Sequence, residues 1–243
     1  LCISAGVPKG LINIVTGDGK VGEMIVNHKD INKIAFTGST EVGKLIREKT
    51  AGSGKSLTLE LGGKSPFVVF DDADLDSAIE GVVDAIWFNQ GQVCCAGSRL
   101  LVHEAIAEKF YKKLKARMKT LRLGNPLDKS IDMGAIIDKK QHEKISRMVS
   151  QSNGKVYQTD IPLPEEGCFF SPTLITDLHT ADPLMQEEIF GPVLVSTTFR
   201  TPSEAIELSN NTTFGLAASI WSENINLCLE LAPKIKAGVV WIN

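Results

Sequence analysis

The sequence lacks several features that would assign it to a specialised class of protein. Only 6% of its 243 residues are aromatic, and no run of apolar residues is long enough to span a bilayer. It has no excess of basic residues, since 26 lysines and arginines face 29 aspartates and glutamates for a net charge of −3. A nucleic-acid partner is therefore not expected. The remaining composition, 43% hydrophobic and 23% charged, predicts a soluble globular protein of one large or two small domains.

Cysteine is also scarce, and its pattern excludes two common structural roles. The five cysteines are irregularly spaced and odd in number: Cys2, Cys94, Cys95, Cys168 and Cys228. Neither a disulfide framework nor a zinc site has this pattern, so we expect free thiols, no metal and a reducing compartment such as the cytoplasm. The chain begins with Leu1 rather than Met and ends directly after an apolar run, so both ends are expected to be cuts through a longer protein.

Short β-rich runs alternate with longer helical patterns, which predicts an α/β fold with a mostly parallel sheet. Strands are expected at 11–15, 33–37, 56–60, 67–70, 99–103, 193–199, 216–221 and 238–242. Helices are expected from 19 to about 28, from 38–40 through 47, from the caps Asp71, Asp72 and Asp74 to Trp87, and at 104–121, 138–152, 202–210 and 223–233. The Gly62–Gly63 pair is the expected domain boundary.

A first motif, FTGSTEVG at Phe36–Gly43, runs from a strand through a Gly-Ser turn into a helix. Free backbone N–H groups at a helix N-terminus, together with the Ser39 hydroxyl, would suit a phosphate. Gly38 would let a pyrophosphate approach the backbone closely. Taken alone, the motif is more simply explained as an ordinary helix cap at Ser39 or Thr40.

A second motif, LELGGK at Leu59–Lys64, places Glu60 at the end of an apolar strand. Open α/β sheets bind ligands at this edge. Partial desolvation there would raise the pKa of the Glu60 carboxyl, as a general base requires. The alternative is a solvated glutamate at a strand end.

A third motif, FNQGQVCCAGSR at Phe88–Arg99, carries two cysteines in a turn rich in glycine and amides. If Cys94 begins a short helix, the helix dipole would lower the pKa of its thiol and make it a nucleophile. Its backbone N–H and neighbouring amides could hold an oxyanion. The alternative is a buried structural cysteine pair.

A fourth motif, QEEIFGP at Gln186–Pro192, combines an acidic pair, an aromatic ring and a Gly-Pro turn. Such a segment could present a carboxylate to a sugar diol and a ring to a flat cofactor. By itself it is equally a loop with two solvated charges.

In combination the four motifs resemble the NAD(P)-dependent aldehyde dehydrogenase superfamily, in its hydrolytic branch and with details most similar to its family 16 members. They occur in the family's order, and Glu60 and Cys94 are 34 residues apart, as the family pattern expects. The resemblance covers essentially the whole chain. It implies an aldehyde dehydrogenase-like α/β fold with Rossmann-like, mostly parallel sheets and flanking helices.

The resemblance also implies roles for individual residues. Cys94 would be the nucleophile that forms a thiohemiacetal and then a thioester, and Glu60 would activate the water that releases the carboxylic acid. Glu188 would hold the nicotinamide ribose and Phe190 would pack beside the nicotinamide. The other implied cofactor contacts, mostly on the pyrophosphate and adenosine side, are Gly19, Gly38, Ser39, Val42, Gly43 and Leu61. The implied cofactor is NAD, with NADP as the alternative, and no metal is implied.

Compared with a family member, the chain is expected to cover about half the length. Residues 1–62 would be the C-terminal part of the dinucleotide-binding domain, with an unpaired strand edge, and residues 63–243 the thiol-bearing catalytic domain. The implied partners are a small aldehyde substrate and, for the full-length protein, a second copy or three further copies of itself. No nucleic acid or membrane span is implied.

Two other functions stay open at this point. A non-catalytic scaffold or binding module with the same fold is an alternative, chiefly for this fragment, because half of the implied cofactor site is absent. A cysteine hydrolase is less favoured, because it leaves the FTGST and EEIFGP motifs unexplained. It would cleave esters or thioesters without a nucleotide.

Overall fold

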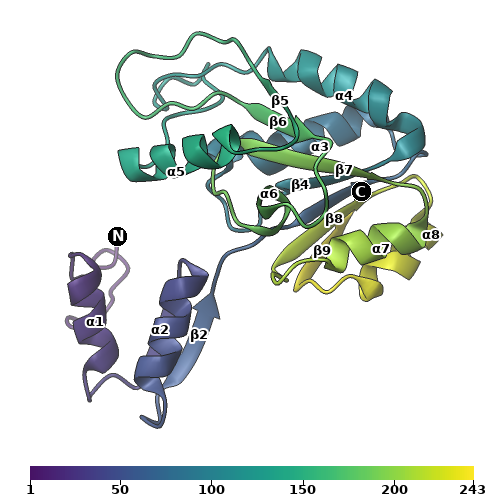
Figure 1. Cartoon of the computed structure of the whole chain (residues 1–243). Coiled ribbons are helices and arrows are strands. Elements are labelled where there is room, and N and C mark those ends of the chain that lie inside the picture. The colour runs from purple at the N-terminus through teal and green to yellow at the C-terminus, as the bar shows by residue number, and fades with distance from the viewer. The chain divides into compact units, whose positions relative to one another are not determined.

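A computed structural model describes all 243 residues, which form two compact units (Figure 1). The first comprises Leu1–Leu61 and the second Gly62–Asn243. No helix of either unit has the length and apolar character needed to cross a membrane, and the longest, α4, has 15 residues.

The first unit is built on two parallel strands, β1 (Lys33–Thr37) and β2 (Ser56–Glu60). Two helices accompany them, α1 (Gly19–Asn27) and α2 (Thr40–Thr50). Asp18 and Ser39 cap the helices, because the side chain of each accepts a hydrogen bond from a backbone N–H of the first turn. The buried core of this unit is small and consists of Val26, Ile34 and Ile46.

The expected strand at 11–15 is wrong. This segment has no ladder partner, and its side chains are exposed, with Ile14 86% accessible. Alternating apolar residues supply the side-chain pattern of a strand, but a strand also needs a neighbour to receive its backbone hydrogen bonds. In this unit β1 and β2 pair only with each other.

The second unit is a seven-stranded sheet in the order β5-β6-β7-β4-β3-β8-β9. All neighbouring pairs are parallel except the antiparallel pair β5 and β6 at one edge. The strands are β3 (Pro66–Val69), β4 (Arg99–His103), β5 (Lys155–Gln158), β6 (Thr173–Thr176), β7 (Val193–Phe199), β8 (Ala217–Trp221) and β9 (Val239–Ile242). The helices are α3 (Leu75–Trp87), η1 (Phe88–Gly91), α4 (Glu104–Met118), α5 (Lys139–Ser150), α6 (Pro183–Gln186), α7 (Pro202–Asn210), α8 (Ile225–Leu231) and η2 (Ala232–Lys234).

Helices cover both faces of this sheet, so its central strands are buried on both sides (Figure 1). Side chains alternate along a strand. Phe67 and Val69 of β3 pack with α3 and α4, whereas Val68 packs on the opposite face with α7 and α8. A third cluster joins β6 and β7 to α5 and α6.

The predicted fold class is confirmed, and most predicted elements lie within a few residues of their observed bounds. Strands β5 and β6 were not predicted. Among the acidic residues expected to cap α3, Asp74 is the cap, accepting from the Ser77 N–H at 2.7 Å. Asp72 instead accepts hydrogen bonds from Ser222 and Asn224, after β8.

Candidate active site

The two adjacent cysteines follow an unusual turn at the end of α3. Asn89, Gln90 and Gly91 all have positive φ values, of 48°, 57° and 70°, so the chain reverses sharply within three residues. Cys94 and Cys95 then occupy a turn closed by the Ala96 N–H and the Val93 carbonyl at 3.1 Å. Cys94 therefore does not begin a helix, and the expected activation of its thiol by a helix dipole is wrong.

Two glutamine side chains of this cysteine loop (Phe88–Ala96) anchor it to the backbone of residues 134–137. Gln90 accepts a hydrogen bond from the Gly134 N–H at 3.0 Å and donates to the Ala135 carbonyl at 3.3 Å. Gln92 accepts from the Ile137 N–H at 3.0 Å. The amides of this motif were expected to help hold an oxyanion, whereas these two bond to backbone groups some 45 residues further along the chain.

The Gly62–Gly63 pair of the second motif contacts the third and fourth motifs. A β-carbon on Gly63 would overlap the carbonyl oxygen of Cys94, and one on Gly62 would overlap the carboxylate of Glu188. The Gly63 N–H donates to Glu188 Oε1 at 3.0 Å. Only glycine allows the backbone to approach this closely. Gly63 therefore connects the cysteine loop to the segment Gln186–Pro192, the acidic loop.

The third and fourth motifs also meet directly. The indole N–H of Trp87 donates to the Pro192 carbonyl at 3.2 Å, and a β-carbon on Gly91 would overlap the carbonyl oxygen of Gly191. Within the second unit, the end of the second motif (Gly62–Lys64) therefore meets the third and fourth motifs.

Glu188 is half-buried, whereas its neighbour Glu187 is exposed. Burial raises the pKa of the Glu188 carboxyl, and the Gly63 N–H together with the cations Lys144 and Lys64 opposes that rise. Oxygen Oε1 is occupied by the Gly63 N–H. The second carboxylate oxygen, Oε2, accepts no hydrogen bond from the protein and remains able to receive one from a ligand.

Phe190 is held in a strained backbone conformation next to Glu188. Its φ is 55°, a region that residues with a bulky side chain rarely adopt. Gln141 Nε2 donates to the carbonyls of Ile189 and Phe190, both at 2.9 Å, and Lys144 Nζ donates to the Glu188 carbonyl at 3.2 Å. Helix α5 thus fixes the acidic loop through two residues that the sequence analysis did not identify.

The two cysteines differ in their surroundings, although both thiols are free and partly buried. Burial, with a smaller contribution from Cys94, raises the pKa of the Cys95 thiol. No hydrogen bond of the structure uses the backbone N–H of Cys94 as donor, so this N–H is available to a ligand.

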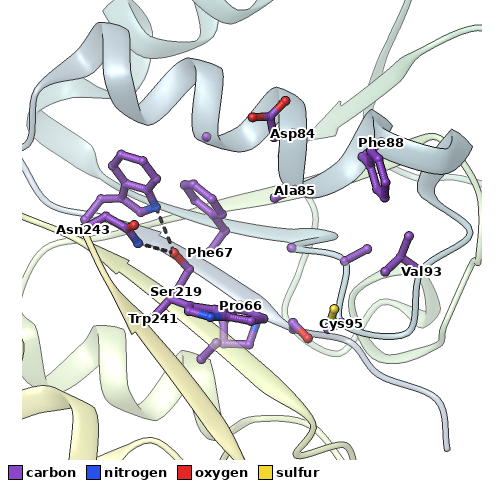
Figure 2. Close-up of a pocket in the computed structure, with 16 residues that line it drawn as sticks. Pro66, Phe67, Asp84, Ala85, Phe88, Val93, Cys95, Ser219, Trp241 and Asn243 are labelled. Atoms are coloured by element: carbon purple, nitrogen blue, oxygen red, sulfur yellow. Dashed lines mark hydrogen bonds between the residues drawn. The ribbon is translucent and has the colours of Figure 1, made fainter. Parts of the chain in front are cut away.

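A cavity of about 390 Å³ lies beside the cysteine loop, and Cys95 rather than Cys94 lines it (Figure 2). Its wall is largely aromatic, from Phe67, Phe88, Trp221 and Trp241, and its one acidic residue is Asp84. Ser219 accepts hydrogen bonds from the Trp221 indole and from Asn243 (Figure 2).

The remaining predicted cofactor residues lie in the first unit. Ser39 Oγ accepts the Val42 N–H at 3.3 Å as the cap of α2, and the Gly38 N–H donates to the Glu60 carbonyl at 3.0 Å. Gly19 and Val42 line a common apolar cavity of about 580 Å³. Gly43 packs so closely on Leu61 that a β-carbon would overlap the leucine side chain, which gives this pair a packing role.

Glu60 ends β2 and is exposed in the first unit. The partial desolvation expected of its carboxyl is therefore not found. Across both units, no group of three or more histidine, cysteine, aspartate or glutamate side chains is placed to hold a metal ion.

A comparison with known protein families identifies the family to which these motifs belong. The model of the aldehyde dehydrogenase family matches residues 1–243. The chain belongs to this family. Aminoaldehyde dehydrogenase 2 of Zea mays is 42% identical over all of this chain and 49% of its own length. Betaine aldehyde dehydrogenase of Bacillus subtilis is 41% identical over 98% of this chain and 50% of its own length.

Solved structures of aldehyde dehydrogenases match equally well. The NAD-dependent aldehyde dehydrogenase of Sinorhizobium meliloti superposes with a TM-score of 0.96 and 38% identity, over 99% of this chain and 49% of that one. Betaine aldehyde dehydrogenase of Staphylococcus aureus, in complex with NAD+, has a TM-score of 0.93 and 38% identity, with the same coverage of both chains.

This chain spans about half the length of the aldehyde dehydrogenases that it matches. Relatives include a pea enzyme named as peroxisomal and an Arabidopsis thaliana enzyme named as mitochondrial. The cytoplasmic location inferred from the cysteine pattern therefore stays a prediction.

Proposed function

We propose that the protein to which this chain belongs oxidises an aldehyde to a carboxylic acid with NAD, using Cys94 as nucleophile and Glu60 as general base. The observation that supports this most is the convergence of Gly63, Cys94 and Glu188 in the second unit. The backbone of the cysteine loop and the Glu188 carboxylate both contact the Gly62–Gly63 pair, and one oxygen of that carboxylate is available to a ligand.

Cys94 performs the covalent step. Its thiolate attacks the aldehyde carbon, and a carbon–sulfur bond forms as the carbonyl π electrons move onto oxygen. The unused backbone N–H of Cys94 stabilises that oxyanion. Loss of a hydride from the same carbon leaves a thioester, which water cleaves to the carboxylic acid and the free thiol. Burial raises the pKa of the Cys95 thiol and so lowers its thiolate fraction, and we assign Cys95 no part in the reaction.

The cofactor residues divide into two groups that suit the two halves of a dinucleotide. Glu188 offers Oε2 to a ribose hydroxyl, and Phe190, whose backbone carbonyl accepts a hydrogen bond from Gln141, offers an aromatic ring. The first turn of α2 has free N–H groups for a phosphate. The cavity beside Gly19 and Val42 is within the size range of small-molecule sites. When bound, NAD supplies the hydride acceptor, and NADP is the alternative.

Glu60 activates the water. It precedes Gly63 by three residues in the sequence. Gly63 contacts Cys94. An exposed carboxylate at a strand end also has access to the water that it must deprotonate.

The domain assignment follows from the same residues. Residues 1–62 are the C-terminal part of a dinucleotide-binding domain, and residues 63–243 carry the thiol.

The full-length protein is a homodimer or homotetramer, and its substrate is a small aldehyde. Aminoaldehydes and betaine aldehyde are the first to test, because several relatives are named for them.

The test compares Cys94→Ala with Cys95→Ala in the full-length protein. We expect Cys94→Ala to lower NAD-dependent aldehyde oxidation by at least about 10⁴-fold, because it removes the nucleophile. Cys95→Ala is the matched control, and we expect it to retain most of the activity. The measurement is formation of reduced cofactor by absorbance, alongside ester hydrolysis without nucleotide.

Three outcomes would contradict the proposal. Turnover that survives in Cys94→Ala would exclude Cys94 as the nucleophile. Ester hydrolysis by a wild-type protein that never reduces NAD would favour a cysteine hydrolase. No activity and no NADH binding in the full-length protein would favour a non-catalytic scaffold.

A further inference from the structure

A cavity of about 350 Å³ in the second unit is not used by the proposed chemistry. Its lining side chains come from helix α5 and the segment that follows it, and from helix α6 with its two cap residues. The volume is within the size range of small-molecule sites, so the side chains that line the cavity decide which ligand it suits.

The two signs of charge around this cavity come from different elements. Both cations, Lys144 and Arg147, lie on α5, and because they are three residues apart they share one face of the helix. Both carboxylates, Asp182 and Glu187, belong to the residues that cap the two ends of α6. The cavity is therefore cationic along α5 and anionic along α6.

These charges line one cavity without pairing with each other. None of the four side chains forms an ion pair, and neither the Arg147 guanidinium nor the Glu187 carboxylate forms a hydrogen bond within the protein. Asp182 uses one oxygen, Oδ1, to accept the Leu184 N–H at 2.8 Å. A molecule with one charge of each sign would find a free partner for both, whereas a simple ion would meet like charge as well as opposite charge.

Apolar side chains line the same cavity, among them Met148 and the buried Leu184. A short methylene chain packed against them would be removed from water, a gain that a bare ion does not have. Gln151 and Asn153 add side-chain amides after the end of α5. Opposite charges separated by a short hydrocarbon chain are the features of an ω-amino acid.

We propose that this cavity binds a short ω-amino acid and that the bound molecule weakens cofactor binding. Its carboxylate pairs with the two cations of α5, and its ammonium pairs with the carboxylates of Asp182 and Glu187. Because these charges are largely exposed to solvent, each ion pair contributes little, and the expected Kd is on the order of 1 mM.

Lys144 connects this cavity to the cofactor residues. Its Nζ donates to the Glu188 carbonyl at 3.2 Å, and a ligand carboxylate competes for that ammonium. The acidic loop then loses one of its contacts with α5. Oxidation of an amine-bearing aldehyde yields an amino acid of this class, so the effect is that of a product on its enzyme, and this part rests on the proposed function.

Chemical-shift titration of the isotope-labelled 243-residue chain tests the binding site. The probes are 4-aminobutyrate, butyrate and butylammonium at constant ionic strength. We expect 4-aminobutyrate to shift the backbone amide resonances of Arg147, Gln151 and Asn153 saturably. Each singly charged probe should bind roughly tenfold more weakly, because it pairs with one side of the cavity only. No saturable shift, shifts confined to residues elsewhere, or equal binding of butyrate would overturn the proposal.

Two variants remove one charge from each side of the cavity. Arg147→Gln and Glu187→Gln, both at exposed positions, should each weaken 4-aminobutyrate binding several-fold. Lys140→Gln is the control, because Lys140 is an exposed cation of α5 that does not line the cavity. Wild-type affinity in Arg147→Gln, or an equal loss in Lys140→Gln, would show that the charges of this cavity do not hold the ligand.

NADH titration of the full-length protein tests the effect on the cofactor. Saturating 4-aminobutyrate should raise the Kd of NADH by about fivefold or more, and saturating NADH should raise the Kd of 4-aminobutyrate by the same factor. Arg147→Gln should bind NADH normally and lose this effect. An effect that persists in Arg147→Gln, or an unchanged Kd in wild type, would overturn the coupling. The chemical-shift titration needs no cofactor, so a failure of the proposed function would leave its result unchanged.

Discussion

At the scale of single residues, the alanine variants of Gly62 and Gly63 can be compared directly. Gly63→Ala would place a methyl group against the Cys94 carbonyl, a backbone atom, whereas Gly62→Ala would meet the end of the Glu188 side chain. Backbone cannot move aside as a carboxylate can. We expect Gly63→Ala to lower the unfolding free energy by about 1–3 kcal/mol, and Gly62→Ala by less than about 1 kcal/mol. Urea denaturation of the 243-residue chain measures both.

The same pair should differ in function. Gly62→Ala should weaken NADH binding to the full-length protein, because Glu188 has to leave its place beside Gly63. Equal stability losses for both variants, or unchanged NADH binding in Gly62→Ala, would show that these contacts do not position the site.

The sequence predicted some residues of the candidate site and missed others, and the difference has a physical reason. Cys94, Glu188 and Phe190 belong to local motifs whose residue types carry the chemistry, so the sequence pointed to them. Gln90 and Gln92 act through contacts made by folding. Gln90 bonds to residues 44 and 45 positions away, and no local pattern encodes that distance.

At the scale of elements, the cysteine loop depends on those glutamine contacts. Gln90→Ala would leave the buried Gly134 N–H without its acceptor, so we expect a loss of about 1–3 kcal/mol in unfolding free energy. The loop should also open more often, and Cys94 should react faster with a thiol reagent. Peptide mapping after timed labelling measures this, with Gln151→Ala, at an exposed position, as control. Unchanged labelling of Cys94 in Gln90→Ala would mean that the positive-φ turn alone holds the loop.

The elements that sequence reasoning misjudged are those that depend on a partner. Segment 11–15 has the apolar pattern of a strand but no neighbour to pair with. Strands β5 and β6 have 4 residues each, and pairing defines them, because β6 pairs with β7 and β5 pairs with β6. The long buried strands and capped helices, by contrast, carry their signals locally.

At the scale of the whole molecule, the two units differ in their cores. The first unit buries Val26, Ile34 and Ile46 and exposes several large apolar side chains, Ile14 among them. The second unit contains three larger clusters. We expect residues 62–243 alone to unfold cooperatively, and residues 1–61 alone to show no thermal transition. Circular dichroism melts of the two fragments measure this. A cooperative melt of 1–61, or none for 62–243, would contradict it.

The most direct test of the account is to identify the acylated residue in a single turnover. In full-length Glu60→Gln, deacylation should be slow, so a thioester should accumulate after mixing with aldehyde and NAD. Rapid quenching, proteolysis and mass spectrometry locate the acyl group. The account predicts acylation of Cys94, only when NAD is present. Acylation of Cys95, thioester formation without NAD, or no accumulation in Glu60→Gln would contradict it.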